Sequence, residues 1–342
     1  MKIGNFDLDS GKTFIIAELS ANHNGSLETA KESIKEMALS GADAVKLQTY
    51  RADTLTLDCD KEDFVIKGGT LWDERRLYEL YEEAYTPWEW HEELFAYARE
   101  LGLECFSSPF DKSAVDFLEQ FDPPAYKIAS FEITDYELIR YVASKKRPII
   151  ISTGVAKIEE IEDVVNICKE ERNEDIVLLK CTSSYPAPLD RANLATIVDM
   201  RARFDVEIGF SDHTLGVSAP IVAVTLGAKV IEKHFILDKS MGGVDSEFSL
   251  DKAEFAQMVQ AVREAEVLVG SIDYSYSQTS RGFARSLYIS APIKKGEVFS
   301  ETNIKSVRPG YSLHPKHLNE ILGKVASRDY ELGDRIEGSL TL

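Results

Sequence analysis

Short apolar runs recur along the first 270 residues and alternate with segments whose apolar residues return every three or four positions. Continuous apolar runs bounded by turn residues are typical of strands buried on both faces. The eight runs are 13–18, 44–48, 103–107, 125–130, 148–152, 176–182, 206–214 and 229–235. Eight strand–helix units in this length predict an α/β fold of the (β/α)₈ TIM-barrel type. A doubly wound open sheet is the alternative, which the lack of a GxGxxG motif after the first run disfavours.

The segments between the runs carry sequence signals for the ends of helices. Asp251 precedes a periodic segment and Glu254 follows three residues later, which predicts a capping box. The side chains expected on the buried face of this helix are Phe255, Met258, Val259, Val262 and Val269. Gly41, Gly102 and Gly227 each follow a helical pattern and precede a run, where a left-handed residue is needed to end the helix.

One connection, residues 53–85, is longer than a barrel requires. It is rich in charged residues, Tyr and Leu, and it contains Gly68-Gly69 and Trp72-Asp73. Its composition indicates an ordered excursion over one end of the barrel, and an insertion without a role is the alternative.

The pattern changes near Gly270. The following polar and aromatic stretch has no helical period and predicts a linker. Beyond it, short β-like runs separated by Lys-Gly and Gly-Asp turns predict a small β-rich domain. The charge balance changes as well, because this domain has 9 basic and 7 acidic residues, whereas the whole chain has 39 basic and 58 acidic residues. The predicted organisation is a barrel domain 1–270, a linker 271–283 and a small domain 284–342.

Composition narrows the class of protein. A hydrophobic fraction of 44% and a charged fraction of 28% are those of a globular protein, and the formal net charge is −19. This charge argues against non-specific binding to nucleic acid and to anionic membranes. No stretch is apolar for long enough to span a bilayer, and the four cysteines show no CxxC spacing. We therefore expect a cytoplasmic protein with reduced thiols, of which Cys105 and Cys181 are expected in the core.

Histidines end the last two apolar runs. His213 lies near the end of the run 206–214 and His234 near the end of the run 229–235, each beside acidic residues. Because consecutive parallel strands end at the same edge, the two imidazoles can face one pocket and hold a divalent metal. The alternative is that each histidine is a hydrogen-bonded structural residue.

Polar residues also gather where the other strands end, which in a barrel is the catalytic face. The set is Glu18, Asn22, Asn24, Lys46, Gln48, Ser107, Ser108, Lys127, Ser130, Glu132, Ser152, Thr153, Ser183, Tyr185, Ser211, Asp212 and Asp245. A lysine within an apolar strand is costly unless its charge is paired. Lys46 and Lys127 with several hydroxyls predict a cradle for phosphate or carboxylate, and internal ion pairs are the alternative.

In several of these positions the sequence resembles the sialic acid synthase family. The shared motifs are Ile16-Ala17-Glu18 with Asn22-His23-Asn24-Gly25, Val45-Lys46-Leu47-Gln48-Thr49, Tyr126-Lys127-Ile128-Ala129-Ser130, Ser152-Thr153-Gly154, Gly209-Phe210-Ser211-Asp212-His213-Thr214 and Glu232-Lys233-His234-Phe235. The tail, with Ile293-Lys294-Lys295-Gly296-Glu297 and Val307-Arg308-Pro309-Gly310, resembles the antifreeze-like (SAF) domain of that family. The resemblance covers residues 3–340.

The resemblance implies an enzyme that condenses phosphoenolpyruvate with an open-chain N-acylated amino sugar, giving a nine-carbon keto acid and phosphate. It implies that His213 and His234 hold the divalent metal, which would be Mn²⁺ or Mg²⁺, with Co²⁺ as a further candidate. The residues implied for phosphoenolpyruvate are Lys46, Lys127, Ser130, Ser152, Ser183 and Ser211.

The same resemblance implies a second group of residues around the sugar. Glu18, Tyr185 and Asp245 would surround it, and Glu132 would transfer protons near the reacting aldehyde. Arg308 would come from the small domain of the other subunit in a domain-swapped homodimer and reach the N-acyl group.

Departures from the usual family pattern indicate a subgroup. Ser183 stands where sialic acid synthases usually have Asn, and residues 242–248 replace a Pro-Asp-His stretch. These features, with residues 69–73 and 311–315, resemble the pseudaminic acid synthases of bacteria that glycosylate flagellin. Their substrate is a 2,4-diacetamido-2,4,6-trideoxy altrose, whose methyl and acetamido groups favour an apolar wall, for which Phe131 and Phe248 are candidates. An N-acetylneuraminate or legionaminate synthase is the alternative within the family.

Two other classes of function stay open at this point. A Schiff-base aldolase would use Lys46 or Lys127 as the nucleophile but leaves both histidines without a role. A carbohydrate- or ice-binding module is the non-enzymatic alternative, although ice binding needs a flat, regular array that the charged and irregular tail does not offer.

Overall fold

The computed structural model describes residues 1–68 and 71–336, and the chain divides into two compact units, 1–270 and 271–342. We call them the barrel unit and the small unit. Gly69 and Thr70 of the predicted excursion and residues 337–342 of the predicted small domain lie outside the described residues.

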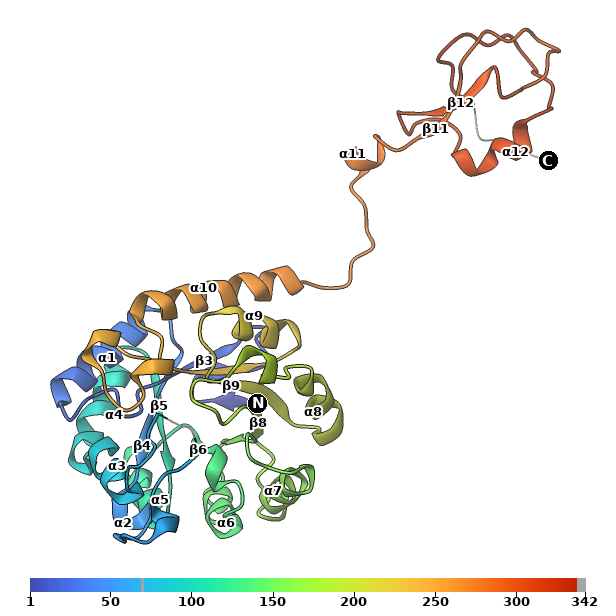
Figure 1. Cartoon of the computed structure of the whole chain (residues 1–342). Coiled ribbons are helices and arrows are strands. Elements are labelled where there is room, and N and C mark those ends of the chain that lie inside the picture. Colours follow the sequence, from blue (N-terminus) through green and yellow to red (C-terminus); the bar gives the residue numbers. More distant parts are fainter. Residues whose placement is uncertain (69–70, 337–342) are drawn as a thin grey trace. The chain divides into compact units, whose positions relative to one another are not determined.

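Eight parallel strands of the barrel unit close into a barrel (Figure 1). The strands are β3 Phe14–Glu18, β4 Ala44–Thr49, β5 Glu104–Pro109, β6 Tyr126–Ile128, β7 Ile149–Ser152, β8 Ile176–Cys181, β9 Glu207–Asp212 and β10 Val230–His234. They pair in chain order, and β10 closes the ring against β3 with His234 opposite Glu18. The predicted TIM barrel is confirmed, and the open-sheet alternative is wrong.

Helices surround the barrel, as Figure 1 shows. They are α1 Leu27–Leu39, α2 Ala52–Leu55, α3 Leu77–Ala84, α4 His91–Glu100, α5 Lys112–Leu118, α6 Tyr136–Ser144, α7 Ile158–Glu170, α8 Thr196–Phe204, α9 Ser218–Thr225 and α10 Lys252–Val269. Short 3₁₀ turns span Glu62–Phe64, Trp88–Trp90, Glu119–Phe121, Ser130–Glu132, Leu189–Arg191, Lys239–Met241, Ser246–Phe248 and Pro315–His317. In the described ranges, none of the helices has both the length and the apolarity that crossing a membrane requires.

The predicted ends of these helices agree with the structure, with one exception. Asp251 caps α10 and forms the capping box with Glu254. Gly41, Gly102 and Gly227 have positive φ angles of 87°, 80° and 97°. The exception is Val269, which was expected on the buried face of α10 but is 55% exposed. It lies in the last turn, where its neighbours Val267 and Leu268 are also exposed.

The core of the barrel unit has two layers. One fills the barrel with Phe14, Ile16, Phe106, Val177 and Val230, and the other packs the outer faces of the strands against the helices. An N-terminal hairpin, β1 Lys2–Ile3 with β2 Phe6–Asp7, adds Ile3 to the inner layer. The barrel interior is therefore apolar at this level, and the polar side chains described below lie at the carboxyl ends of the strands.

The described parts of the excursion, residues 53–68 and 71–85, belong to the barrel unit. It contains the end of α2, the turn at Glu62–Phe64 and α3, and Val65 forms a bridge with Arg76. Trp72 donates a hydrogen bond of 3.0 Å from Nε1 to the carbonyl oxygen of Val244. The segment therefore reaches a loop that follows β10, which agrees with the predicted excursion over the barrel mouth.

The small unit has its own core. Strand β11 Ser286–Ile289 pairs antiparallel with β12 Ile304–Val307, and α12 Leu318–Ile321 adds Ile321. The β-like runs beside the Lys-Gly and Gly-Asp turns, residues 293–298 and 333–336, form only isolated bridges, through Ile293 and Val298 and through Arg335. The predicted linker was expected to have no helix, but it contains the four-residue helix α11 Gln278–Arg281.

Candidate active site

Two buried lysines lie inside the mouth of the barrel among carboxylates. Lys46 Nζ is 2.8 Å from Glu18 Oε2 and 3.2 Å from Glu232 Oε2. Lys127 Nζ is 3.8 Å from Glu232 Oε1 and donates a hydrogen bond of 2.7 Å to Ser152 Oγ. Both lysines therefore form internal ion pairs, as the alternative interpretation of the sequence predicted. The binding of an anion by these lysines stays a prediction. We call Lys46, Lys127, Glu18 and Glu232 the charged cluster.

Burial and charge shift the pKa values in this cluster in opposite directions. Burial lowers the pKa of Lys46 to about 8, and the nearby Glu232 carboxylate opposes the shift. Burial acts to raise the pKa of Glu232, but Lys127 and Lys46 outweigh it and hold the pKa at about 2. Glu232 is consequently ionised. It neutralises the charge of Lys127 and shares that of Lys46 with Glu18.

Small hydroxyl side chains line the space beside the lysines. Ser130 Oγ is 2.8 Å from Ser183 Oγ and accepts a hydrogen bond of 3.2 Å from the Val155 backbone N–H. Ser211 Oγ donates to Glu232 Oε1 at 3.0 Å. A side chain in place of Gly154 would collide with Ser183 and Ser130. The structure thus brings the predicted serines and lysines together around a space that only a glycine leaves open.

His213 and His234 lie side by side, with ring centroids 5.4 Å apart. His213 Nδ1 is 3.2 Å from the carbonyl oxygen of Thr182, which can only accept, so Nδ1 carries a proton. Burial acts to lower the pKa of this imidazole, but the neighbouring Cys181 outweighs it and raises the pKa. Burial holds the pKa of His234 well below its usual value, which keeps this imidazole neutral. A histidine with one nitrogen fixed by a backbone carbonyl, as in His213, is typical of metal ligands when its other nitrogen is deprotonated.

A buried nitrogen of His234 bears on whether the two histidines could bind a metal. His234 Nδ1 is buried without a hydrogen-bond partner, 3.9 Å from Asp245 Oδ2. Among residues 1–68 and 71–336, no three His, Cys, Asp or Glu side chains are placed to hold an ion together. The unpaired Nδ1 atom of His234 and the neighbouring ring of His213 could serve as two ligands of a metal, with oxygen atoms of water or substrate as the others, and the metal site stays a prediction.

Aromatic rings cover the histidines on one side. Tyr185 lies 4.4 Å from His213, and Phe248 lies 4.8 Å from His234 and 5.1 Å from Tyr185, between ring centroids. Burial raises the pKa of the Tyr185 phenol. Of the two predicted wall residues, Phe248 is buried at this place, whereas Phe131 is 61% exposed.

Hydrogen bonds connect Asp245 to the charged cluster. Gln48 Nε2 donates to Glu18 Oε1 at 3.0 Å and to Ser20 Oγ at 2.9 Å. Because an amide nitrogen only donates, the Ser20 hydroxyl proton is directed to Asp245 Oδ2. Glu18 and Asp245, both predicted near the sugar, are therefore held by one buried chain of side chains.

Glu132 has a raised pKa. It lies in a turn after β6, and burial raises its pKa to about 7, with Lys127 opposing the shift. Its Oε2 atom is buried and has no hydrogen-bond partner. A carboxyl group that is partly protonated near neutral pH can donate a proton to a reacting group.

Besides Ser20, two more residues at the site, Glu232 and Cys181, had no predicted role there. Glu232 stands two positions before His234 on β10, and side chains two apart on a strand point to the same side. This spacing could have identified it. Cys181 was expected only as a core residue, and it is buried, but its Sγ lies 3.8 Å from His213 Nδ1. No sequence signal pairs that cysteine with His213.

Arg308 belongs to the small unit. It follows β12 and is exposed. Its predicted part in binding the sugar stays a prediction.

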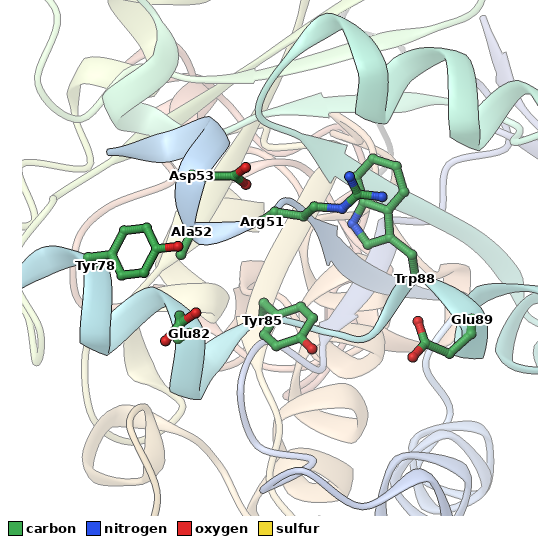
Figure 2. A pocket seen from close by; sticks show the side chains of 8 residues that line it. All are labelled: Arg51, Ala52, Asp53, Tyr78, Glu82, Tyr85, Trp88 and Glu89. Carbon is green, nitrogen blue, oxygen red and sulfur yellow. The ribbon is translucent and has the colours of Figure 1, made fainter. Parts of the chain in front are cut away.

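A surface cavity of about 330 Å³ lies beyond the end of β4, apart from the residues described so far. Figure 2 shows Arg51 and Trp88 among its lining residues, with Asp53 and Glu82 nearby. The Arg51 guanidinium lies over the Trp88 ring, 4.2 Å from its centroid. No residue predicted for the active site lines this cavity.

Known proteins with similar sequences share both units. Residues 33–274 match the NeuB family and residues 284–336 match the SAF domain. The chain is 56% identical over 342 residues to a pseudaminic acid synthase of Campylobacter jejuni, covering 99% of both chains. It is 49% identical over 318 residues to a pseudaminic acid synthase of Helicobacter pylori, covering 92% and 93%. The solved N-acetylneuraminic acid synthetase of Leptospira borgpetersenii has a TM-score of 0.73 at 28% identity, covering 82% of this chain and 93% of its own.

Proposed function

This chain belongs to the NeuB family, and we propose that it is a transferase that condenses phosphoenolpyruvate with an N-acylated amino sugar as a pseudaminic acid synthase. The observation that carries the proposal is that two buried lysines with serine hydroxyls lie at the same barrel mouth as two neighbouring histidines. An anion and an aldehyde can be held side by side there. Identities of 49–56% to pseudaminic acid synthases over nearly the full length support the same reaction.

Phosphoenolpyruvate would bind at the charged cluster. Lys46 and Lys127 supply positive charge, and Ser130, Ser152, Ser183 and Ser211 supply hydroxyl donors for the phosphate and carboxylate oxygens. The ion pairs of Lys46 with Glu18 and Glu232 keep its charge in place before the anion arrives. Binding would then exchange some carboxylate contacts for contacts with substrate.

His213 and His234 would hold a divalent cation, Mn²⁺, Mg²⁺ or Co²⁺. Such an ion, when bound, withdraws electrons from the aldehyde oxygen and makes its carbon more electrophilic. Thr182 fixes the orientation of the His213 ring through its carbonyl oxygen.

The reaction joins the methylene carbon of the enolpyruvate to the aldehyde carbon of the open-chain sugar. Water then adds to C2 of the former enolpyruvate, and the tetrahedral intermediate expels phosphate by cleavage of the C–O bond. Glu132, with its pKa near 7, would give its proton to the aldehyde oxygen as that oxygen becomes a hydroxyl. The lysines would hold the phosphate throughout, which keeps the two reacting carbons together.

The sugar would lie against Glu18, Asp245, Tyr185 and Phe248. We propose 2,4-diacetamido-2,4,6-trideoxy-altrose as the substrate and pseudaminic acid as the product, in a pathway for flagellin glycosylation. The buried rings of Phe248 and Tyr185 suit the apolar groups of such a sugar.

Three further parts of the proposal concern the setting of the enzyme. Arg308 of one subunit would reach the N-acyl group in the site of its partner, in a domain-swapped homodimer. The enzyme would work in the cytoplasm, where thiols such as its four free cysteines stay reduced.

The decisive experiment is phosphate release from phosphoenolpyruvate with added Mn²⁺ and each candidate sugar in turn. We expect release with the trideoxy-altrose and much slower release with N-acetylmannosamine or with the diacetamido sugar that leads to legionaminic acid. A preference for either of the latter would replace the proposed substrate. Trapping of the protein by borohydride together with activity in excess chelator would instead support a Schiff-base aldolase that uses Lys46 or Lys127.

A further inference from the structure

Trp72 connects the excursion of residues 53–85 to the candidate sugar site. Its ring centroid lies 5.7 Å from that of Tyr185 and 6.5 Å from that of Phe248. Its Nε1 donates a hydrogen bond of 3.0 Å to the carbonyl oxygen of Val244, the residue before Asp245. Trp72 therefore contacts both rings that cover the histidines and the loop that carries a candidate sugar ligand.

The rings of Trp72, Tyr185 and Phe248 contact one another, and we call them the aromatic wall. Tyr185 lies 4.4 Å from His213 and Phe248 lies 4.8 Å from His234, and Trp72 packs against both of these rings, at 5.7 and 6.5 Å. The aldehyde end of the sugar would lie at the histidines, so the opposite end of the carbon chain would extend along the wall towards Trp72. The side chain of Trp72 has one polar group, and that group already donates to Val244. The indole ring can thus offer a sugar substituent apolar contact.

We propose that Trp72 is a specificity-determining residue, which selects an amino sugar that ends in a methyl group over one that ends in a hydroxymethyl group. This inference rests on the proposed function above. Burial of a methyl group against the ring stabilises the complex, whereas burial of a hydroxyl group there costs the hydrogen bonds that it made with water. Apolar sites discriminate against an added hydroxyl by up to about 10²-fold. We expect a preference of roughly 10- to 100-fold from the whole wall.

Trp88 provides a matched control. It adjoins the same excursion, and its Nε1 likewise donates to a backbone carbonyl, that of Tyr50, at 3.1 Å. Its ring stacks on Phe117 at 4.5 Å and lines the surface cavity of Figure 2 instead of the aromatic wall. Any general effect of replacing a partly buried tryptophan near this segment should appear at both positions.

The test compares kcat/KM for 2,4-diacetamido-2,4,6-trideoxy-altrose with kcat/KM for its 6-hydroxy counterpart, with phosphoenolpyruvate saturating and phosphate release as the readout. Trp72→Ala should reduce the preference of the wild type by about tenfold, through a higher KM for the 6-deoxy sugar, and leave the KM of phosphoenolpyruvate unchanged. Trp72→Phe should keep most of the preference, because it keeps an apolar ring. Trp72→Gln should reduce it further than Ala, since its amide can bind the hydroxyl. Trp88→Phe should keep the full preference.

Several outcomes would overturn the inference. One is an unchanged preference in Trp72→Ala, and another is a KM for phosphoenolpyruvate that rises as much as that of the sugar. If Trp72→Ala does not fold, the comparison of Trp72→Gln with Trp72→Phe decides, and equal preferences in the two would contradict the proposal. Absence of phosphate release by the wild type with either sugar would instead remove the proposed function and this inference with it.

Discussion

The two sides of the candidate site are built from different parts of the barrel. On the phosphate side, Lys46 and Glu232 are strand residues, and their charges are matched inside the barrel wall. On the sugar side Glu18 is also a strand residue, but the three rings, those of Trp72, Tyr185 and Phe248, belong to segments between the strands. Strands fix positions because each is paired on both sides, whereas connections can vary in length and sequence without disturbing the barrel.

This difference suggests that the two sides of the site have different functions. Charged side chains on strands suit the binding of a reactant that every reaction of this type would share. Rings on connections suit the choice among sugars, because a changed ring alters apolar contact without leaving a buried charge unpaired. The predictions below separate the two sides, since a change on the phosphate side should affect folding and chemistry, and a change on the sugar side should affect selectivity.

The largest effect is expected from Lys46→Met. Removal of the ammonium group leaves Glu18 and Glu232 buried together without this partner, and breaking a buried ion pair from one side costs about 3–5 kcal/mol. Urea unfolding should show that loss in the free energy of unfolding, and phosphate release should vanish. Lys31→Met, which removes a partly exposed partner of the exposed Glu93, is the control and should change stability by less than about 1 kcal/mol. Equal losses in both variants would contradict the assigned role of the charged cluster.

His213→Ala and His234→Ala should come next. Each removes a proposed metal ligand but no buried ion pair of the charged cluster, so the fold should persist while metal-dependent phosphate release falls by about 10³-fold. Loss of bound Mn²⁺, measured by equilibrium dialysis, should accompany it. Full activity in both variants would refute the metal site. Full binding of Mn²⁺ without activity would assign the histidines another role.

Glu132→Gln tests the proton donor. With a pKa of about 7, the carboxyl group is protonated below pH 7 and loses its proton above it, so the kcat of the wild type should decline as pH rises through 7. The variant should be about 10²-fold slower and should lack this decline. A decline that persists unchanged in Glu132→Gln belongs to another group.

Arg308→Ala is expected to have the smallest effect of this series. If Arg308 binds the N-acyl group, its loss should raise the KM of the sugar by about tenfold and leave that of phosphoenolpyruvate nearly unchanged. Mixing this variant with inactive His234→Ala subunits tests the swapped arrangement. A domain-swapped dimer would regain one site with both residues intact, so recovery of activity is expected. A larger rise in the KM of phosphoenolpyruvate would argue against the proposed place of Arg308.

The pattern of apolar runs was enough to predict the barrel, because a strand covered on both faces must be apolar along its length. All eight runs became strands, with ends shifted by one or two residues. The polar residues at the strand ends could also be predicted as a group, since a parallel barrel brings all carboxyl ends to one face. Val269 shows the limit of the same reasoning, because helical period gives the direction of a side chain and not whether anything packs against it.

The sequence did not predict which residues contact one another within the site. The rule of strand ends placed Lys46 and Glu18 at the same mouth but did not show that they pair. Cys181 next to His213, and Trp72 next to Tyr185, join residues from distant parts of the chain.

The sequence by itself determined the eight-stranded barrel, the change from strand–helix units to short β-like runs after Gly270, and the set of polar residues at the mouth. The alternation of apolar runs with helical segments, and the ends of the strands, are local properties of the chain. The tertiary structure decided which of these residues meet. Closure of β10 against β3 brings the carboxylates and lysines of different strands together, and Trp72 meets the rings of Tyr185 and Phe248 only in the folded chain. Such pairings depend on distances across the barrel, and a one-dimensional pattern does not contain them.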